Sequence, residues 1–189
     1  MIEYTEEEHF KGLNFNKTPQ TFKTYEYCKF EDCNISNFDL SSIKFISFEF
    51  LNCDLSNAKI ADTFFQECNF DNCKLIGLQF DTCNPFGFEN SFTNCQLDHC
   101  NFYQMNLTNC SFIESRLKNV DFSEANLSKI KIRNCDLDQA KFEFTKLLNT
   151  DLRASYNFNI DPENNQLKGS RFSSQELAGL LLKYGLRID

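Results

Sequence analysis

The chain has 189 residues, including 22 Phe, ten Cys and no Trp, and its formal net charge is −8. A composition this rich in Phe can bury far more apolar area than a disordered one, so we expect a single folded domain. The negative charge argues against direct nucleic-acid binding, which needs clustered Lys and Arg. No apolar run is long enough to span a membrane, and the acidic start, Glu3 to Glu8, does not resemble a signal peptide, so we expect a cytoplasmic protein.

A large apolar residue returns every five positions through most of the chain. The first series is Phe30, Ile35, Leu40, Phe45, Phe50, Leu55, Ile60, Phe65, Phe70, Leu75 and Phe80, and a second resumes two residues out of phase from Phe92 to Leu152. Such a period fits neither a helix nor a simple strand. It predicts a short straight side and then a corner every five residues, with the large residue and the residue two before it pointing inward. No charged residue occupies either position between residues 28 and 152, as burial requires.

Four such sides make one coil of 20 residues. Steps of 20, with one step of 22, align Phe10, Phe30, Phe50, Phe70, Phe92 and Phe112. Outward-facing residues of opposite charge then lie next to each other on neighbouring coils, for example Lys29 beside Glu49 and Asp121 beside Lys141. Residues 1–172 are therefore predicted to form an all-β, right-handed, four-sided parallel β-helix of about seven coils, roughly 35 Å tall.

The two-residue slip falls between residues 83 and 90, where the columns on both flanks realign. Pro85 and Gly87 suit a bulged corner, and either Phe86 or Phe88 is expected to fill the vacated core position. Two interpretations remain open for this irregular corner, Pro85 to Phe88. It is either an accommodated insertion or a small protrusion that faces a partner.

Ten cysteines invite a metal or disulfide hypothesis, but all ten occupy the inward position two before the large residue. They are Cys28, Cys33, Cys53, Cys68, Cys73, Cys83, Cys95, Cys100, Cys110 and Cys135. Zinc ligands lie closer together, typically two to four residues apart, so we expect buried, reduced thiols and a reducing compartment. His9 and His99 have no adjacent nucleophile or metal ligand, and no catalytic or phosphate-binding motif is present. We therefore expect no enzyme, no metal and no cofactor.

The acidic side chains are concentrated in residues 28–110, where 11 acidic residues face four basic ones. The candidate partner-binding surface is Glu31, Asp32, Asp39, Glu49, Asp54, Asp62, Glu67, Asp71, Asp81 and Asp98. Two interpretations remain open: a solvated surface without a partner, or a surface that imitates DNA phosphates toward a basic protein.

Residues 173–189 differ in pattern from the repeat. Ser173 and Glu176 form a capping box, apolar residues follow at helical spacing, and Gly185 ends the predicted α-helix. Residues 186–188 could add a short strand. The segment either caps the core or pairs with a second chain about a two-fold axis. The candidate dimer interface is Leu177, Leu180, Leu181, Tyr184, Leu186 and Ile188.

Segments such as Cys53-Asp54-Leu55-Ser56-Asn57 and Ala125-Asn126-Leu127-Ser128-Lys129 resemble the pentapeptide-repeat family motif A-(D/N)-(L/F)-X-X, and the resemblance covers about residues 10 to 152. With its acidic surface and terminal helix, the chain is similar to the Qnr group of quinolone-resistance proteins and to the microcin B17 and albicidin immunity proteins. This resemblance implies a dimeric rod, joined through its C-terminal segments, that protects DNA gyrase or topoisomerase IV by mimicry of DNA. Some Qnr proteins carry longer loops, whereas the interruption here is two residues. The alternative is a protein-interaction scaffold of the same family with no topoisomerase role.

Overall fold

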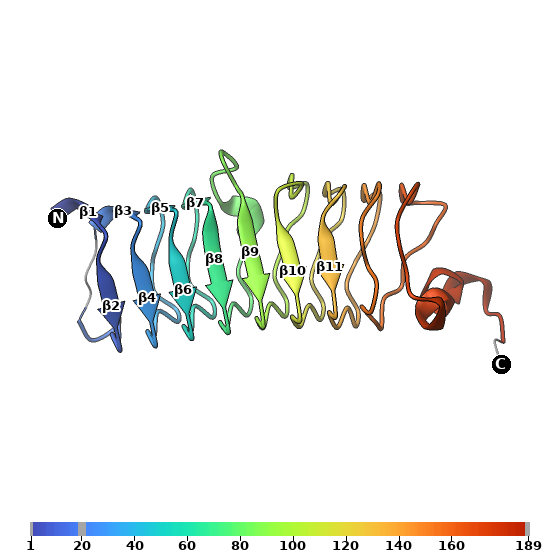
Figure 1. Cartoon of the computed structure of the whole chain (residues 1–189), viewed down its shortest axis with the longest axis horizontal. Helices are drawn as coiled ribbons and strands as arrows, with labels where there is room; N and C mark the ends of the chain where they lie inside the picture. Colours follow the sequence, from blue (N-terminus) through green and yellow to red (C-terminus); the bar gives the residue numbers. More distant parts are fainter. Residues whose placement is uncertain (1, 19–21, 188–189) are drawn as a thin grey trace.

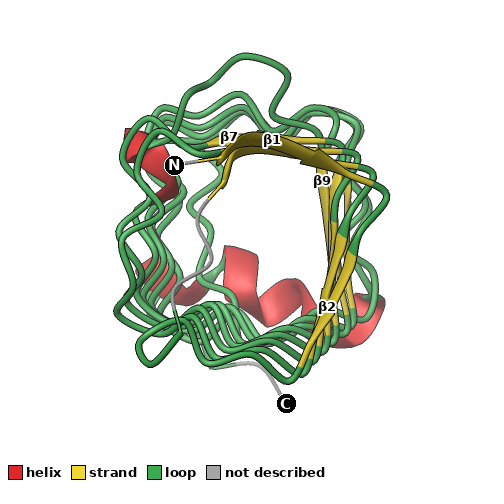
Figure 2. Cartoon of the chain, turned by 90° about the vertical axis from the view of Figure 1, so that its left-hand side faces the viewer, coloured by secondary structure: helices red, strands yellow, loops and turns green. Residues whose placement is uncertain are grey.

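The computed structural model describes residues 2–18 and 22–187, which form one straight rod (Figure 1). Seen along its axis, the rod has four sides, and strands occupy two adjacent ones (Figure 2). The expected four-sided parallel β-solenoid is confirmed. Ile188 of the predicted dimer interface lies outside the described residues.

Side 1 is a seven-stranded parallel sheet with the order β11-β10-β9-β8-β6-β4-β2. Its strands are β2 (His9–Lys11), β4 (Lys29–Glu31), β6 (Glu49–Leu51), β8 (Cys68–Asp71), β9 (Asn90–Thr93), β10 (Ser111–Ile113) and β11 (Lys131–Arg133). Single bridges, Lys131 to Asp151 and Asp151 to Arg171, continue the same register toward the C-terminus.

Side 4 is a four-stranded parallel sheet, which precedes side 1 in each coil. Its strands are β1 (Ile2–Glu6), β3 (Phe22–Glu26), β5 (Lys44–Ile46) and β7 (Phe64–Gln66). Side 2, which follows side 1, and side 3 are held by single bridges between coils, such as Asn34 to Asp54 on side 2 and Asp39 to Lys59 on side 3.

The corners explain why Asn, Asp and Ser recur in the outward positions. Corner residues such as Asn37, Asn52 and Asn57 have φ of 58°, 54° and 55°, in the left-handed region that short polar side chains tolerate best. The residue before the large apolar one accepts a hydrogen bond from the backbone two residues on, as Asp54 does from the Ser56 N–H at 2.9 Å. Corners that carry Asn or Asp at this position are therefore stabilised locally by their own side chain, as at Asn34, Asp39 and Asp121.

The core is built from columns of stacked Phe rings. On side 1, Phe50, Phe70 and Phe92 stack with ring centroids 4.7 Å and 5.1 Å apart and nearly parallel planes. On side 3, Phe102 stacks on Phe80 at 4.7 Å and on Phe122 at 5.4 Å. Rings from the two columns meet edge to face, an arrangement that aromatic quadrupoles favour.

The strand register shifts by two residues at the irregular corner. Glu49 pairs with Asn69 at a step of 20 residues, whereas Phe70 pairs with Phe92 at a step of 22. Phe88 fills the core position and packs 5.9 Å from Phe80, while Phe86 is 73% exposed. The extra residues bulge outward as the loop that rises above the rod between β8 and β9 (Figure 1).

The C-terminal segment is helical, but it forms 3₁₀ helices and not the predicted α-helix. Ser174–Leu180 and Leu182–Tyr184 form the 3₁₀ helices η2 and η3, and Gly185, with φ of 61°, ends the second. A Cβ at Gly179 would lie 2.4 Å from the Phe158 carbonyl oxygen, and the Gly179 carbonyl accepts a hydrogen bond from the Ile160 N–H at 3.1 Å. The segment is therefore shaped by close contact with the last coil.

The predicted capping box is also wrong. The Ser173 hydroxyl accepts a hydrogen bond from the Ala154 N–H at 2.8 Å and makes no cap to the helix. Ala154 is a corner residue with φ of 62°, and the Ser173 hydroxyl takes the place of the backbone carbonyl to which corner N–H groups such as that of Glu114 donate. The predicted strand after the helix is not formed at Leu186 or Arg187.

Candidate functional site

The ten predicted acidic residues do not form one surface, because the register places them on three sides and one corner of the rod. Glu31, Asp32, Glu49 and Asp71 belong to side 1, Asp54 and Asp98 to side 2, Asp39, Asp62 and Asp81 to side 3, and Glu67 to the corner between sides 4 and 1. The sequence interpretation counted acidic residues along the chain without assigning them to sides, although the 20-residue period would have allowed it.

Four of the ten form ion pairs within the rod, and two of these four, Asp98 and Glu31, also have largely buried side chains, whereas Asp32 and Glu49 are about half exposed. Asp98 is buried, and one of its oxygens lies 2.5 Å from the Arg116 guanidinium, whose pKa it raises. Glu31 contacts Lys11 and lies 3.0 Å from His9, and the hydrogen bond from Lys11 lowers the pKa of the carboxyl group. These two side chains hold neighbouring coils together, so we exclude them from a surface that binds a partner.

The carboxylates that remain on sides 4 and 1 gather at the N-terminal end of the rod. We name the acidic end as Glu6, Glu7, Glu26, Asp32, Glu49, Glu67, Asp71 and Glu89, among which Lys11, Lys23, Lys29 and Lys44 also lie. The Tyr4 hydroxyl donates to Glu6 at 2.7 Å or to Glu26 at 3.0 Å, which joins carboxylates of successive coils. Sequence analysis missed Glu6, Glu7 and Glu26, although Glu6 and Glu26 are 20 residues apart, and it also omitted Glu89.

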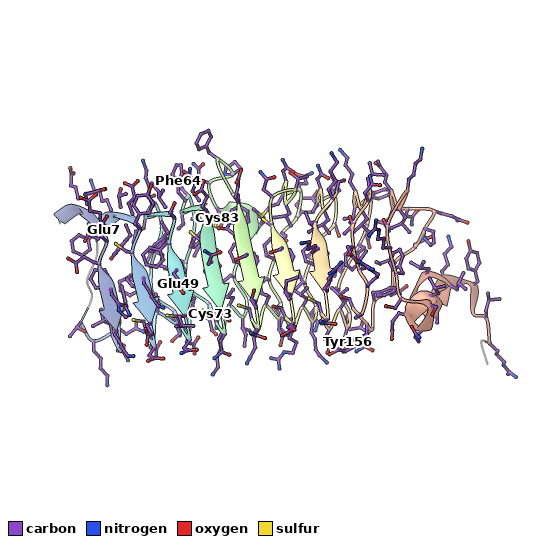
Figure 3. All side chains as sticks on the ribbon, in the orientation of Figure 1. Glu7, Glu49, Phe64, Cys73, Cys83 and Tyr156 are labelled. Atoms are coloured by element: carbon purple, nitrogen blue, oxygen red, sulfur yellow. The ribbon has the colours of Figure 1, made fainter. Side chains whose placement is uncertain are left out.

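Side chains of the acidic end are held by neutral polar neighbours. Asn52 donates to the Asp32 carboxylate at 3.1 Å, and Ser47 donates to Glu67 at 3.0 Å. Glu49 lies 3.3 Å from the Lys29 ammonium and points outward from side 1 (Figure 3). These contacts limit the motion of the three carboxylates. The result is an ordered array of negative charge on neighbouring coils, about 4.8 Å apart.

The predicted dimer interface is only partly exposed. Leu180 packs against the apolar core as part of the cap, and Leu181 is half-buried, whereas Leu177, Tyr184 and Leu186 are exposed. Sequence analysis missed Leu182, which is 56% exposed, because a run of three leucines does not show which one faces the core.

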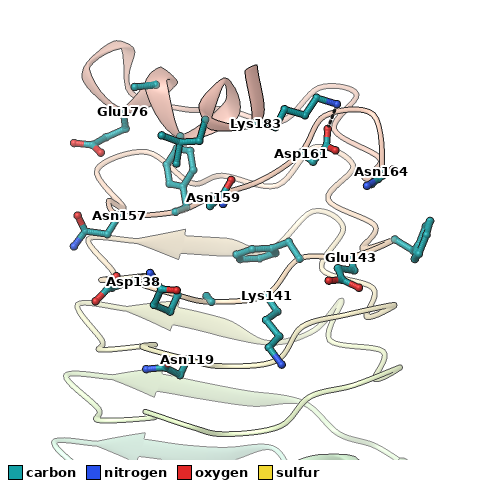
Figure 4. Close-up of a pocket in the computed structure, with 18 residues that line it drawn as sticks. Asn119, Asp138, Lys141, Glu143, Asn157, Asn159, Asp161, Asn164, Glu176 and Lys183 are labelled. Carbon is teal, nitrogen blue, oxygen red and sulfur yellow. Dashed lines mark ion pairs between the residues drawn. The ribbon is translucent and has the colours of Figure 1, made fainter. Parts of the chain in front are cut away.

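Ion pairs fix the terminal helices to the rod. The Lys183 ammonium lies 2.6 Å from both Asp161 and Glu163, and the Tyr184 hydroxyl donates to Glu163 at 2.8 Å. Figure 4 shows the Lys183 to Asp161 pair beside an open hollow of about 950 Å³. The lining is mixed, with Asn119, Asp138 and Lys141 below the helix. No cluster of three or more potential metal ligands occurs within residues 2–18 and 22–187.

The ten cysteines are buried, as their repeat position predicts. Their thiols contact backbone carbonyls, for example Cys100 with Leu75 at 2.9 Å and Cys135 with Phe112 at 3.5 Å. Burial raises the pKa of Cys110 to about 12 and that of Cys135 to about 11, so both thiols stay protonated at neutral pH. Such thiols are part of the core and are poor nucleophiles. Among the described residues, no helix combines the length and the hydropathy that crossing a membrane requires.

Comparison with known proteins agrees with this architecture. A family model for the pentapeptide repeat region matches residues 88–180, and one for eight copies of the repeat matches residues 49–84. No curated protein sequence matches the chain. Two solved structures of trypsin-treated variants of QnrB1, a plasmid-mediated fluoroquinolone resistance protein, are similar in fold. One is 18% identical over 98% of this chain and 100% of that chain, with a TM-score of 0.65. The other is 20% identical over 97% and 99%, with a TM-score of 0.66. The chain belongs to the family of pentapeptide-repeat proteins.

Proposed function

We propose that this protein binds a type II topoisomerase, DNA gyrase or topoisomerase IV, by mimicry of DNA, and that it has no enzymatic activity. The observation that carries the proposal is the acidic end, where carboxylates of sides 4 and 1 repeat from coil to coil on a rigid rod. A groove that binds DNA phosphates is basic, so it attracts such an array and steers its approach. A cytoplasmic location is part of the proposal, since the partner acts there.

The similarity in fold to QnrB1 supports the choice of partner, because that protein is described as a fluoroquinolone resistance protein and nearly the whole of both chains is aligned. In the proposed role, the rod occupies the DNA-binding groove of the topoisomerase and lowers the effect of a fluoroquinolone or a topoisomerase toxin.

A gyrase supercoiling assay with a fluoroquinolone tests this role. We expect the protein to restore supercoiling and to bind gyrase, and we expect Glu49→Lys/Glu67→Lys to weaken binding about tenfold or more, because two contacts become repulsive. The matched control is Asp39→Lys/Glu143→Lys on side 3, which changes the net charge equally away from the acidic end and should bind like wild type. Absence of gyrase binding at micromolar protein would contradict the proposal.

The alternative function is a protein-interaction scaffold without a topoisomerase role. Phe86, at 73% exposure on the protruding loop, is the observation that favours it, because a large exposed aromatic side chain is typical of a contact residue. In that case Phe86→Ser should abolish capture of the partner, while Glu49→Lys/Glu67→Lys should not.

We also propose that two chains pair through the C-terminal segment. Leu177, Leu182, Tyr184 and Leu186 expose apolar side chains at the end of the rod, and a two-fold contact would bury them. At about 0.5 M NaCl, where contacts between exposed charges are screened, Leu182→Asp should convert the dimer to a monomer in sedimentation velocity, because it places a charge in the contact without touching the core. Leu180→Asp is a poorer test, since Leu180 also stabilises the cap. A mass unchanged by Leu182→Asp would show that the segment only caps the rod.

A further inference from the structure

The C-terminal end of sides 4 and 1 is basic, although the protein as a whole carries a net charge of −8. We name this surface the basic corner. It consists of Lys129, Lys131, Arg133, Lys146, Arg153, Lys168 and Arg171. Asp151 lies among these cations, and Glu114 borders them on the preceding coil, where its N–H donates to the Arg133 carbonyl at 2.9 Å. The bridges from Lys131 to Asp151 and from Asp151 to Arg171 place three successive coils in one column. Backbone hydrogen bonds from Lys129 to Leu148 and from Asn149 to Lys168 extend the surface across the corner onto side 4.

Asp151 fixes two of these cations in place. It is only 8% exposed, and it accepts hydrogen bonds from Arg153 Nε at 2.9 Å and from Arg133 Nε at 2.9 Å. The hydrogen bond from Arg153 contributes most to lowering the Asp151 pKa, so the carboxylate is ionised. One negative charge is thus shared by two guanidinium groups, and the basic corner keeps a large positive excess.

The other five cations of the basic corner form no ion pair within the described part of the chain. They are Lys129, Lys131, Lys146, Lys168 and Arg171, and the ion pairs next to them are those of Asp151 with Arg133 and Arg153. Elsewhere on the rod, cations such as Arg116 and Lys118 are matched by Asp98 and Asp136. The basic corner is therefore complementary to an external group of negative charges.

The same two sides carry the opposite charge at the other end of the rod. On side 1 the acidic end and the basic corner are separated by neutral outward residues, Ser91 and Thr93 on β9 and Ser111 and Ile113 on β10. Two exposed carboxylates lie beside these strands, Glu89 immediately before β9 and Glu114 immediately after β10. From Glu49 to Lys131 the column passes through four coil spacings, or about 19 Å, whereas Glu89 and Lys129 at the neighbouring corner are two spacings, or about 10 Å, apart. Both separations exceed the screening length of about 8 Å at physiological salt, so the two ends act as distinct charged surfaces.

We propose that sides 4 and 1 bind the same two sides of a second copy of this chain, lying antiparallel, with the two-fold axis near β9. In this arrangement each basic corner faces the acidic end of the other copy, and the neutral outward face of β9 lies at the two-fold axis. Such a contact is isologous, since one patch pairs with itself and both charged contacts form together.

Charge complementarity favours a second copy over a nucleic acid. A polyanion long enough to follow the rod past the basic corner would meet the acidic end on the same sides, and it would approach a protein of net charge −8. An antiparallel copy instead meets a complementary charge at both ends. The contact uses neither Leu182 nor the other apolar residues of the terminal helices, so it is separable from the end-to-end pairing proposed above.

A charge-swap experiment in the Leu182→Asp background tests the antiparallel contact without the end-to-end one. We expect self-association in sedimentation velocity at low salt, weakened on the order of tenfold as NaCl rises from about 0.05 M to about 0.5 M. Lys131→Glu/Arg171→Glu and Glu49→Lys/Glu67→Lys should each abolish association, and an equimolar mixture of the two should restore it as a heterodimer. Lys59→Glu/Lys141→Glu on side 3 is the matched control and should associate like the parent.

Three outcomes would overturn the proposal. The first is a monomer at all salt and protein concentrations, and the second is failure of the mixed variants to associate while circular dichroism shows each of them folded. The third is binding of a labelled 20-base-pair DNA duplex that Lys131→Glu/Arg171→Glu abolishes, without self-association of the protein. That third result would assign the basic corner to nucleic acid instead.

Discussion

Above about pH 8.5 the protein is expected to lose stability steeply. The cause is the difference between its buried thiols and the same thiols in the unfolded chain, where their pKa is about 8.5. In the folded protein, burial raises the pKa of Cys110 to about 12 and that of Cys135 to about 11, and it raises the pKa of Cys68, Cys83 and Cys100 as well. These groups remain protonated in the fold while they ionise in the unfolded chain.

The sign follows from proton binding. A group whose folded pKa is raised contributes stability that is complete below its unfolded pKa and is lost as the pH rises toward its folded pKa. Each fully protected thiol then removes about 1.4 kcal/mol per pH unit, and five of them remove about 7 kcal/mol per unit. A typical domain is stable by only about 5 to 15 kcal/mol, so we expect unfolding before pH 11 is reached.

Urea unfolding in the presence of a reductant, repeated at pH 7, 8, 9 and 10, measures this loss. The structure supplies conservative variants, because hydroxyl groups already occupy the same inward position. Thr63 donates to the Leu40 carbonyl at 2.9 Å one coil before Cys83, and Ser115 and Ser155 flank Cys135 in its column. Cys83→Thr and Cys135→Ser should each lower the pH slope by about 1.4 kcal/mol per unit. A free energy of unfolding that stays constant from pH 7 to pH 10 would contradict the explanation.

The inward residues could be predicted from the sequence because the fold is nearly one-dimensional. Each coil contacts only its neighbours, so a local period decides which side chains are buried. That logic predicts Phe102 in the core and Cys100 beside it, and both are buried. It left Phe86 and Phe88 undecided, because either could fill one vacant position. The choice depends on contact between Phe88 and Phe80, a core residue of side 3.

The C-terminal segment could not be predicted to the same depth, because distant residues determine it. Gly179 looks like an ordinary helix residue in the sequence, but its closeness to Phe158 shapes the segment. Ser173 looks like a helix cap, but its hydroxyl is used by Ala154 of the preceding coil. The acidic residues show a different limit. The sequence shows how many acidic residues there are. It does not show that Asp98 forms an ion pair with Arg116, because that pair depends on the contact between neighbouring coils.

Phe102→Ala is expected to divide the rod into two halves that unfold separately. The Phe102 ring is fully buried, stacks between Phe80 and Phe122, and meets Phe92 and Phe112 edge to face at 6.3 Å and 5.7 Å. Replacing a buried Phe by Ala costs about 3 to 5 kcal/mol, since the cavity cannot collapse fully. In a solenoid that cost falls on the contacts between adjacent coils, which transmit cooperativity along the rod.

Urea unfolding followed by circular dichroism should show the loss of stability of Phe102→Ala, and hydrogen exchange should show the division, with amides on the two sides of Phe102 protected to different extents. Phe102→Leu keeps most of the volume and should cost less than about 1.5 kcal/mol. Phe144→Ala is the matched surface control, because its ring is 66% exposed, and it should change the free energy of unfolding by less than about 0.5 kcal/mol. A single cooperative transition for Phe102→Ala, with uniform exchange along the chain, would show that cooperativity passes through the backbone ladders and not through the stacked rings.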